Sequence, residues 1–279
     1  MKIGVNLWIW GAPFRTDRHL GLLAKARSMG AETVEFAMEE ETVMDTVLMC
    51  RALTDEGLEC SVVGLFGPPH DLSLHDMSRR AGVEYAKRCI DVTAEIGASV
   101  FSGAVVGVGG HEPISPNDYQ TRIKHAAESL HTLGVHAQKA GVRMVVEALN
   151  RYESHFVNTA AEARVLVDAA DHEAIGVHLD TFHMGIEEDH LGDAIRRAGD
   201  KLMHIHVSES HRGTPGTGLT PWDQVAQGLR DIGYEGHAVI ESVDHTSWLG
   251  PLACIWRPLA PSGDDLARNG LQFLRKRLR

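Results

Sequence analysis

The stretch Leu202–Gly218, LMHIHVSESHRGTPGTG, carries the clearest sign of how this chain folds. It begins as an apolar run with histidines set into it, and it then breaks into a polar, glycine-rich loop that contains Glu209, His211 and Arg212. A buried strand that ends in a ligand-type residue and continues as such a loop is typical of the active site of an α/β barrel. We therefore expect His206, near the strand end, and Arg212, in the loop, to serve one site.

Outward from this stretch, short apolar runs alternate with longer segments of helical period. The expected strands are Ile3–Trp8, Thr33–Met38, Cys60–Phe66, Val100–Val106, Arg143–Leu149, Ile175–Asp180, Leu202–Ser208 and Ala238–Ser242. The expected helices are Asp17–Met29, Glu41–Glu56, Asp76–Ile96, Asn117–Ala140, Thr159–Ala169, His190–Ala198, Pro221–Asp231 and Asp264–Leu278. Eight alternating units with strands buried on both faces predict an α/β fold: a single-domain (β/α)8 TIM barrel over residues 1–279, with its active site at the carboxyl ends of the strands.

Boundary signals support the barrel. Glycines follow five of the helical segments, where a left-handed C-cap favours them: Gly30, Gly57, Gly97, Gly141 and Gly233. The competing fold, an open doubly wound sheet, would show a glycine-rich phosphate loop after the first strand, and WIWGAPF (residues 8–14) is not one. The longest irregular stretches, Gly67–His75, Gly107–Pro116 and Val243–Gly263, all follow strands and are expected on the catalytic face.

Composition narrows the classes of partner. The chain has 279 residues, and its net charge of −11 argues against a nucleic acid or an anionic membrane as partner. Its four cysteines lack CxxC spacing, which favours reduced thiols. The N-terminal MKIGVNLWIW resembles a first strand more than a signal peptide, and no apolar run is long enough to span a membrane. We expect a cytoplasmic location.

Four consecutive expected strands each contain a polar ligand type within an apolar run. They are Glu147 in VVEAL, Asp180 in GVHLD, His206 in HIHV and Glu241 in VIES, each about one strand–helix unit from the next. In a barrel they would lie near the carboxyl ends of strands five to eight and face one centre.

Burying three carboxylates together is costly unless a cation neutralises them. Three carboxylates and one imidazole suit Mn²⁺, Mg²⁺ or Co²⁺, with zinc as an alternative, and no nucleotide cofactor is expected. A single acid or histidine near a strand end is more often a cap or an ion-pair partner than a ligand. The joint spacing of the four favours a metal site.

Further polar groups surround this centre. His178 lies two residues before Asp180 and His204 two residues before His206, so each is expected on the same strand face, one layer deeper in the barrel. They could orient a metal ligand, or they could be histidines of the core. Beyond the strand ends, Glu153, His183 and Arg212 offer an acceptor, a neutral donor and a fixed cation to a polar ligand. Exposed loop positions would explain these three equally well.

Several motifs together resemble one family. They are VVEALNRYE (Val145–Glu153), HLDTFHMGIEE (His178–Glu188), HIHVSESHRGTPGTG (His204–Gly218) and VIES (Val239–Ser242), with weaker likeness along nearly the whole chain. The sequence resembles the ketose 3-epimerases of the D-tagatose/D-psicose (D-allulose) 3-epimerase type, within the sugar isomerase–epimerase TIM barrels.

The resemblance implies a divalent metal, usually manganese, bound by Glu147, Asp180, His206 and Glu241. It also implies that Glu147 and Glu241 are the acid–base pair for epimerisation of a free ketose at C3. The chemistry is consistent, because chelation of O2 and O3 would stabilise the cis-enediolate left when the C3 proton departs. A carboxylate on each face of C3 could then remove and return the proton.

For the substrate, the resemblance implies that Glu153, His183 and Arg212 bind the O1–O3 end of the sugar. It also implies a homodimer or homotetramer. Neither Glu209 nor His211 receives a role.

The sequence departs from the family in the part that would contact the rest of the sugar. Asn6 and Val243 stand where bulky aromatics are expected, and the loop AVVGVGGHEP (residues 104–113) lacks a tryptophan. The remaining aromatic side chains could form an apolar wall or belong to the core: Trp8, Trp10, Phe14 and Trp248.

Three other functions compete. The nearest is a different reaction in the same barrel: an aldose–ketose or inosose isomerase, or a lyase acting on a 3-keto-glycoside. An endonuclease of the same superfamily would need a multinuclear zinc site and a basic groove, which a net charge of −11 opposes. A non-catalytic sugar-binding protein would have no use for two opposed, buried carboxylates.

Overall fold

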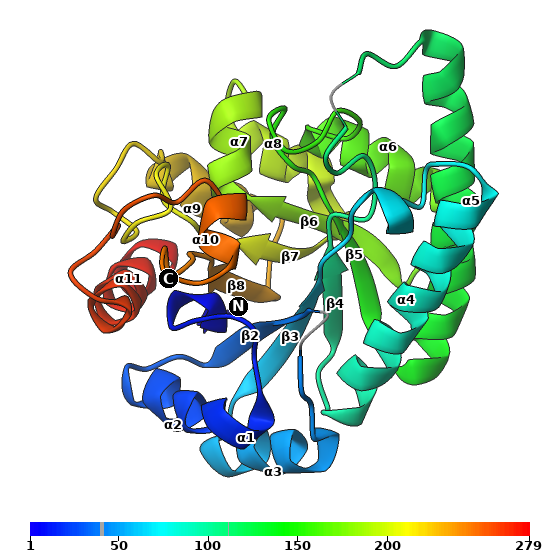
Figure 1. The fold of residues 1–279 in the computed structure, drawn as a ribbon. Helices are drawn as coiled ribbons and strands as arrows, with labels where there is room; N and C mark the ends of the chain where they lie inside the picture. The colour runs from blue at the N-terminus through cyan, green and yellow to red at the C-terminus, as the bar shows by residue number, and fades with distance from the viewer. Residues whose placement is uncertain (40–41, 111) are drawn as a thin grey trace.

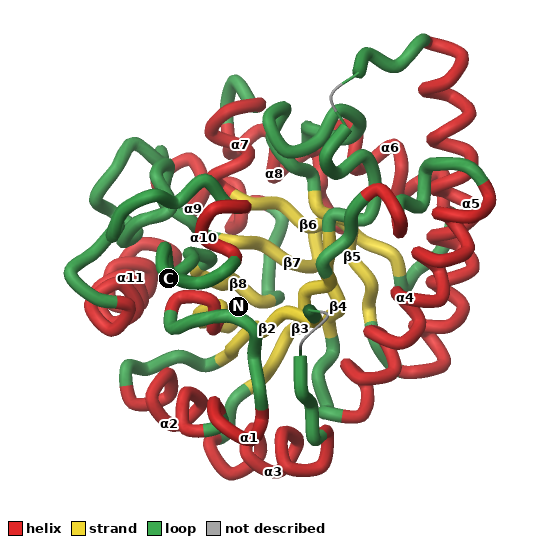
Figure 2. Tube along the Cα trace, viewed as in Figure 1, coloured by secondary structure: helices red, strands yellow, loops and turns green. Residues whose placement is uncertain are grey.

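The computed structural model describes residues 1–39, 42–110 and 112–279 and forms a closed barrel of eight parallel strands. The strands run in chain order around the barrel: β1 (Lys2–Asn6), β2 (Thr33–Met38), β3 (Glu59–Gly64), β4 (Val100–Gly103), β5 (Arg143–Glu147), β6 (Ile175–Asp180), β7 (Leu202–His206) and β8 (His237–Ile240). Helices surround the strands on the outside (Figure 1), and Figure 2 shows the yellow strands enclosed by red helices. The predicted (β/α)8 barrel is confirmed, and the open sheet is excluded.

The α-helices are α1 (Thr16–His19), α2 (Gly21–Ser28), α3 (Thr46–Glu56), α4 (Asp76–Glu95), α5 (Pro116–Ala140), α6 (Ala160–Ala170), α7 (Thr181–Glu187), α8 (Leu191–Ala198), α9 (Trp222–Asp231), α10 (Leu249–Leu252) and α11 (Gly263–Leu278). Three short 3₁₀ turns accompany them: η1 (Leu7–Ile9), η2 (Pro68–His70) and η3 (Gly199–Lys201). Among the described residues, no helix combines the length and the apolar character that crossing a membrane would require.

Several predicted helix boundaries are wrong. The segment Asp17–Met29 forms two helices, α1 and α2, which meet at Leu20. The helix predicted from Glu41 begins at Thr46, because the Asp45 side chain caps it by accepting from the Leu48 N–H; Glu41 itself lies outside the described residues.

The catalytic face is more helical than predicted. The loop expected after β6 is the helix α7, and the irregular stretches after β3 and β8 contain η2 and α10. Short helices of this kind lack the length over which a periodic pattern becomes visible in sequence.

Most predicted strands are too long at their carboxyl ends. β1 ends at Asn6 because the Asn6 side chain accepts from the Trp8 N–H and starts η1. β5, β7 and β8 end at Glu147, His206 and Ile240, where the chain leaves the ladder for the loops of the catalytic face. Glu241 therefore lies one residue beyond its strand.

The predicted helix ends are otherwise confirmed. All five predicted C-cap glycines have positive φ, from 61° at Gly57 to 94° at Gly30. At the start of α6, Thr159 and Glu162 form a capping box in which each side chain accepts from the other residue's backbone N–H.

The strand register gathers polar groups inside the barrel. Glu147 pairs with His178 across β5 and β6, and Asp180 pairs with His206 across β6 and β7. The aliphatic core instead lies largely between the strands and the surrounding helices. The barrel interior is thus lined in part by fully buried polar side chains: Asn6, Glu35, Ser61, Ser102, His178, His204 and His206.

Candidate metal and substrate site

The four predicted metal ligands meet at the carboxyl ends of β5–β8. Glu147, Asp180, His206 and Glu241 each offer a ligand atom, and these atoms all lie within 4.8 Å of one another. All four side chains are buried. The predicted ligands thus lie at the last residues of β5, β6 and β7 and one residue beyond the end of β8. These are the four neighbouring strands on which the sequence placed them.

The His206 ring points its Nδ1 into this cluster. Nδ1 lies 3.3 Å from Glu241, 3.7 Å from Asp180 and 3.8 Å from Glu147, measured to carboxylate oxygens. It is buried and has no hydrogen-bond partner among the described residues. A buried nitrogen without a partner, facing three carboxylates, fits a divalent cation bound by one nitrogen and three oxygens.

The charges in the cluster are unequal. Burial, together with the charges of Glu241 and Asp180, raises the pKa of Glu147 well above its ordinary value. Burial alone would raise the pKa of Asp180, but Arg212 and His206 hold it well below. Burial alone would lower the pKa of His206, but the carboxylates of Glu241 and Glu35 raise it well above 6.5. Without a metal, Glu147 and His206 therefore hold their protons to a higher pH than an ordinary glutamate or histidine does.

Arg212 lies against the ligand cluster itself. Its guanidinium donates to Asp180 and Glu241, and it stacks 4.1 Å from the centre of the Phe182 ring. Its backbone is left-handed, with φ of 62°, and the Ser242 hydroxyl donates to its carbonyl at 2.6 Å. The cation that the sequence predicted for substrate thus pairs with two of the predicted metal ligands.

His183 and Glu153 are brought together through Asn150. The Asn150 side-chain amide donates to Glu153 at 2.8 Å and contacts His183 Nδ1 at 2.7 Å. Because the Asn150 backbone N–H also points at Nδ1, that nitrogen accepts and Nε2 carries the proton. Burial lowers the pKa of His183, so the ring is a neutral donor, with Nε2 3.7 Å from Glu147. His183 lies on α7 and not in the predicted loop.

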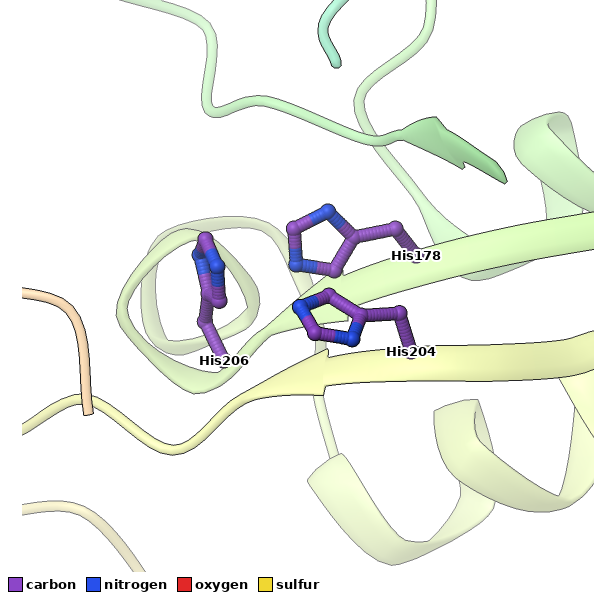
Figure 3. A group of neighbouring side chains, drawn as sticks. All are labelled: His178, His204 and His206. Atoms are coloured by element: carbon purple, nitrogen blue, oxygen red, sulfur yellow. The ribbon is translucent and has the colours of Figure 1, made fainter. Parts of the chain in front are cut away.

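Inside the barrel, the ring of His206 lies against two further histidine rings, those of His178 and His204. Figure 3 shows His178 from β6 and His204 and His206 from β7 with their rings close together. The ring centroids of His178 and His206 are 4.2 Å apart, and His178 Nδ1 lies 2.6 Å from the Ser102 hydroxyl. His178 and His204 are fully buried, and burial lowers the pKa of both. They are therefore neutral supports one layer below the ligands.

One buried acid in this region was not predicted from the sequence. Glu35, on β2, lies with Oε1 2.7 Å from His206 Nε2 and Oε2 2.8 Å from His204 Nε2. The available signal was a single charge in the apolar run TVEFAM. Nothing in the sequence indicated that β2 would face β7 across the barrel.

Glu209 has a structural role in the loop after β7. Its carboxylate accepts from the backbone N–H groups of Ser210, Gly216 and Thr220 and from the Trp222 indole, at 2.7 to 3.1 Å. The loop therefore turns around a buried carboxylate, and this turn carries Arg212 back to the site.

These hydrogen bonds predict a pH-dependent stability. Burial opposes ionisation of Glu209, but the donated hydrogen bonds outweigh it and lower its pKa from 4.5 to about 2. The ionised form therefore stabilises the fold above pH 4.5, and this contribution disappears as the pH falls through about 2. We expect Glu209→Gln to lower the Tm at pH 7, with a difference from wild type that shrinks below pH 4.5 in thermal scans. A difference independent of pH would contradict this role.

Two of the four remaining aromatics lie at the mouth. The Trp8 and Trp248 indoles each donate at 2.8 Å to Glu39, which follows β2. Trp8 packs in a small apolar cluster with Ala37, Val63, Leu249 and, at its edge, Val243. In contrast, Phe14 packs on Phe36 in the main core, and the Trp10 indole donates to Asp264. Only Trp8 and Trp248 therefore suit the predicted apolar wall.

Known proteins share this architecture. The xylose isomerase-like TIM barrel family matches residues 23–277. A ketose 3-epimerase of Arthrobacter globiformis is 30% identical, covering 100% of this chain and 97% of its own, and a D-psicose 3-epimerase of Agrobacterium fabrum is 32% identical, covering 91% of each.

A solved L-ribulose 3-epimerase superposes with a TM-score of 0.91 at 29% identity, over 99% of this chain and 94% of its own. The match in sequence and in structure extends over the whole barrel and so includes all four strands that carry the ligand cluster. This chain therefore belongs to the xylose isomerase-like TIM barrel family and, within it, to the ketose 3-epimerases, which are isomerases.

Proposed function

We propose that this protein epimerises a free ketose at C3, with a divalent metal held by Glu147, Asp180, His206 and Glu241. The observation that carries the proposal is that two carboxylates from strands that are not neighbours, Glu147 of β5 and Glu241 just after β8, belong to one cluster of ligand-type side chains. When bound, a metal such as Mn²⁺ would stabilise negative charge on the sugar oxygens next to the reacting carbon.

The two glutamates move the proton. The C3–H bond is weakened by the neighbouring C2 carbonyl, so a carboxylate on one face removes the proton, and the electron pair forms the C2–C3 double bond of an enediolate. The glutamate on the opposite face then delivers a proton to C3 and inverts it. One glutamate is ionised and the other protonated at the start of each turnover, and their roles exchange in the reverse reaction.

Three further residues would orient the sugar. His183 supplies a neutral Nε2–H close to Glu147, and Arg212 supplies a cation 3.3 Å from that nitrogen. Glu153, held by Asn150, supplies an acceptor at the same edge. We propose that they bind the O1–O3 end of the ketose, and that Arg212 turns from the cluster toward substrate when metal neutralises Asp180 and Glu241.

The expected Mn²⁺ preference, the homodimer or homotetramer, and the cytoplasmic location remain predictions. The free thiols support the last of these, because all four cysteines are unpaired among the residues described.

A panel of ketoses, inososes and 3-keto-sugars in D₂O with Mn²⁺ tests the proposal. We expect deuterium at C3 of a ketose together with formation of its C3 epimer, detected by NMR. An aldose product, an inosose product or elimination from a 3-keto-glycoside would instead identify a different reaction in the same barrel.

A further inference from the structure

The fully buried carboxylate of Glu35 lies at the centre of the barrel interior and has no part in the chemistry above. Its Oε1 lies 2.7 Å from His206 Nε2 and accepts from the Asn6 amide at 2.9 Å. Its Oε2 accepts from the Ser61 hydroxyl at 2.8 Å and lies 2.8 Å from His204 Nε2. Four polar groups from β1, β3 and β7 thus converge on one carboxylate of β2.

The barrel register builds this arrangement. Asn6, Glu35 and Ser61 are direct partners on β1, β2 and β3, so they occupy one row of the interior. The Asn6 side-chain oxygen accepts from the Trp8 N–H, which leaves the amide nitrogen facing Glu35. Asn6 is also the position at which a bulky aromatic was expected from the resemblance. An aromatic side chain there could not supply the amide that donates to Glu35.

The contacts determine which His206 nitrogen is free. Both Glu35 oxygens already accept hydrogen bonds, Oε1 from the Asn6 amide and Oε2 from the Ser61 hydroxyl. Because Oε1 also lies 2.7 Å from His206 Nε2, that nitrogen carries the proton. The lone pair of the neutral ring then lies on Nδ1, the atom that faces Glu147, Asp180 and Glu241.

We propose that Glu35 is a positioning residue that acts through His206. By accepting from Nε2, Glu35 fixes the ring orientation and the tautomer that present Nδ1 to the metal, and Asn6 and Ser61 fix Glu35 in turn. This inference rests on the metal site of the proposed function. Carboxylates behind metal-binding histidines typically contribute 10- to 100-fold to metal affinity.

Glu35→Gln provides the direct test. Glutamine keeps the shape but places an NH₂ group where the Asn6 amide, the Ser61 hydroxyl and His206 Nε2 converge, so at least one of these donors loses its acceptor. We expect Mn²⁺ affinity, measured by isothermal titration calorimetry, to fall about 10- to 100-fold. In metal-free protein labelled with ¹⁵N-histidine, at an alkaline pH at which the His206 ring is neutral, the His206 signal, assigned with His206→Asn, should lose its Nε2–H form. Glu35→Asp should restore part of the affinity.

Glu59→Gln is the matched control. Glu59 pairs with His237 at 2.8 Å in the same kind of carboxylate–imidazole contact, but it touches none of the four ligands. We expect unchanged Mn²⁺ affinity and an unchanged His206 signal. Asn6→Ala removes one donor to Glu35 without altering any charge, so it should weaken Mn²⁺ binding less than Glu35→Gln does. If Glu35→Gln does not fold, Asn6→Ala takes its place in the test.

The readouts separate this inference from the proposed function. The positioning role would be overturned if Glu35→Gln left both the Mn²⁺ affinity and the His206 tautomer unchanged. If only Asn6→Ala folds, the same result in that variant would overturn it. A protein that shows the expected affinity loss yet epimerises no ketose would support the role of Glu35 and overturn the proposed reaction.

Discussion

Replacing Glu147 or Glu241 with glutamine should lower the rate of ketose epimerisation by about a thousandfold, since each removes one member of the acid–base pair. Glutamine is nearly isosteric, but it cannot take or return a proton. Because both glutamates also belong to the ligand cluster, rates should be measured at saturating Mn²⁺, with metal content determined for each variant. The measurement is deuterium incorporation at C3 together with epimer formation, followed by NMR.

Glu84→Gln is a suitable control for this experiment. Glu84 lies on α4, where its carboxylate pairs with Lys87 and its side chain is 63% exposed. We expect this variant to epimerise at the wild-type rate. If Glu147→Gln and Glu241→Gln both retained exchange and epimerisation, the acid–base assignment would be wrong.

Removing metal should abolish activity while leaving the barrel folded. Metal stabilisation of a developing oxyanion contributes several kcal/mol, so chelation with EDTA should lower the epimerisation rate by more than about a hundredfold, and Mn²⁺ should restore it. The fold should survive because Arg212 pairs with Asp180 and Glu241, and because the raised pKa of Glu147 reduces the negative charge left in the cluster.

Far-UV circular dichroism and initial rates on the same chelated sample test both halves of this expectation. Metal analysis by mass spectrometry verifies that the sample is metal-free. Full activity in verified apoprotein would exclude a metal-assisted reaction. Loss of helical signal on chelation would instead show that Arg212 does not compensate for the cation.

The sequence predicts the barrel and the ligand cluster for related physical reasons. Buried strands and capping glycines are local signals; the strands recur once per unit and the glycines follow five of the expected helices, so the order of eight units is visible without a structure. The candidate ligands follow, because in a parallel barrel the inward-facing polar residues at the carboxyl ends of the strands point toward the same centre. Glu147, Asp180 and His206 satisfied this rule on strands, and Glu241 satisfied it just beyond one.

What the sequence could not reveal depends on contacts across the barrel. Glu35 and His206 come from opposite sides of the barrel and are far apart in the chain, so no spacing rule connects them. The support that Asn150 gives to His183 depends on the end of β5 lying beside α7, a helix too short to predict. Likewise, Glu209 was visible as a charged loop residue, but its four donors became apparent only in three dimensions.

The candidate ligands and the small apolar cluster around Trp8 come largely from different halves of the chain, which has an evolutionary consequence. The candidate ligands all come from the second half of the chain, whereas Trp8, Ala37 and Val63 of the small apolar cluster come from the first and only its buried member Leu249 comes from the second. Mutations in the first half are therefore expected to change which sugar the protein accepts while leaving the candidate ligands unchanged. Libraries confined to the first three strand–loop units, with Asn6, Glu35 and Ser61 held constant, are where new substrate ranges should emerge.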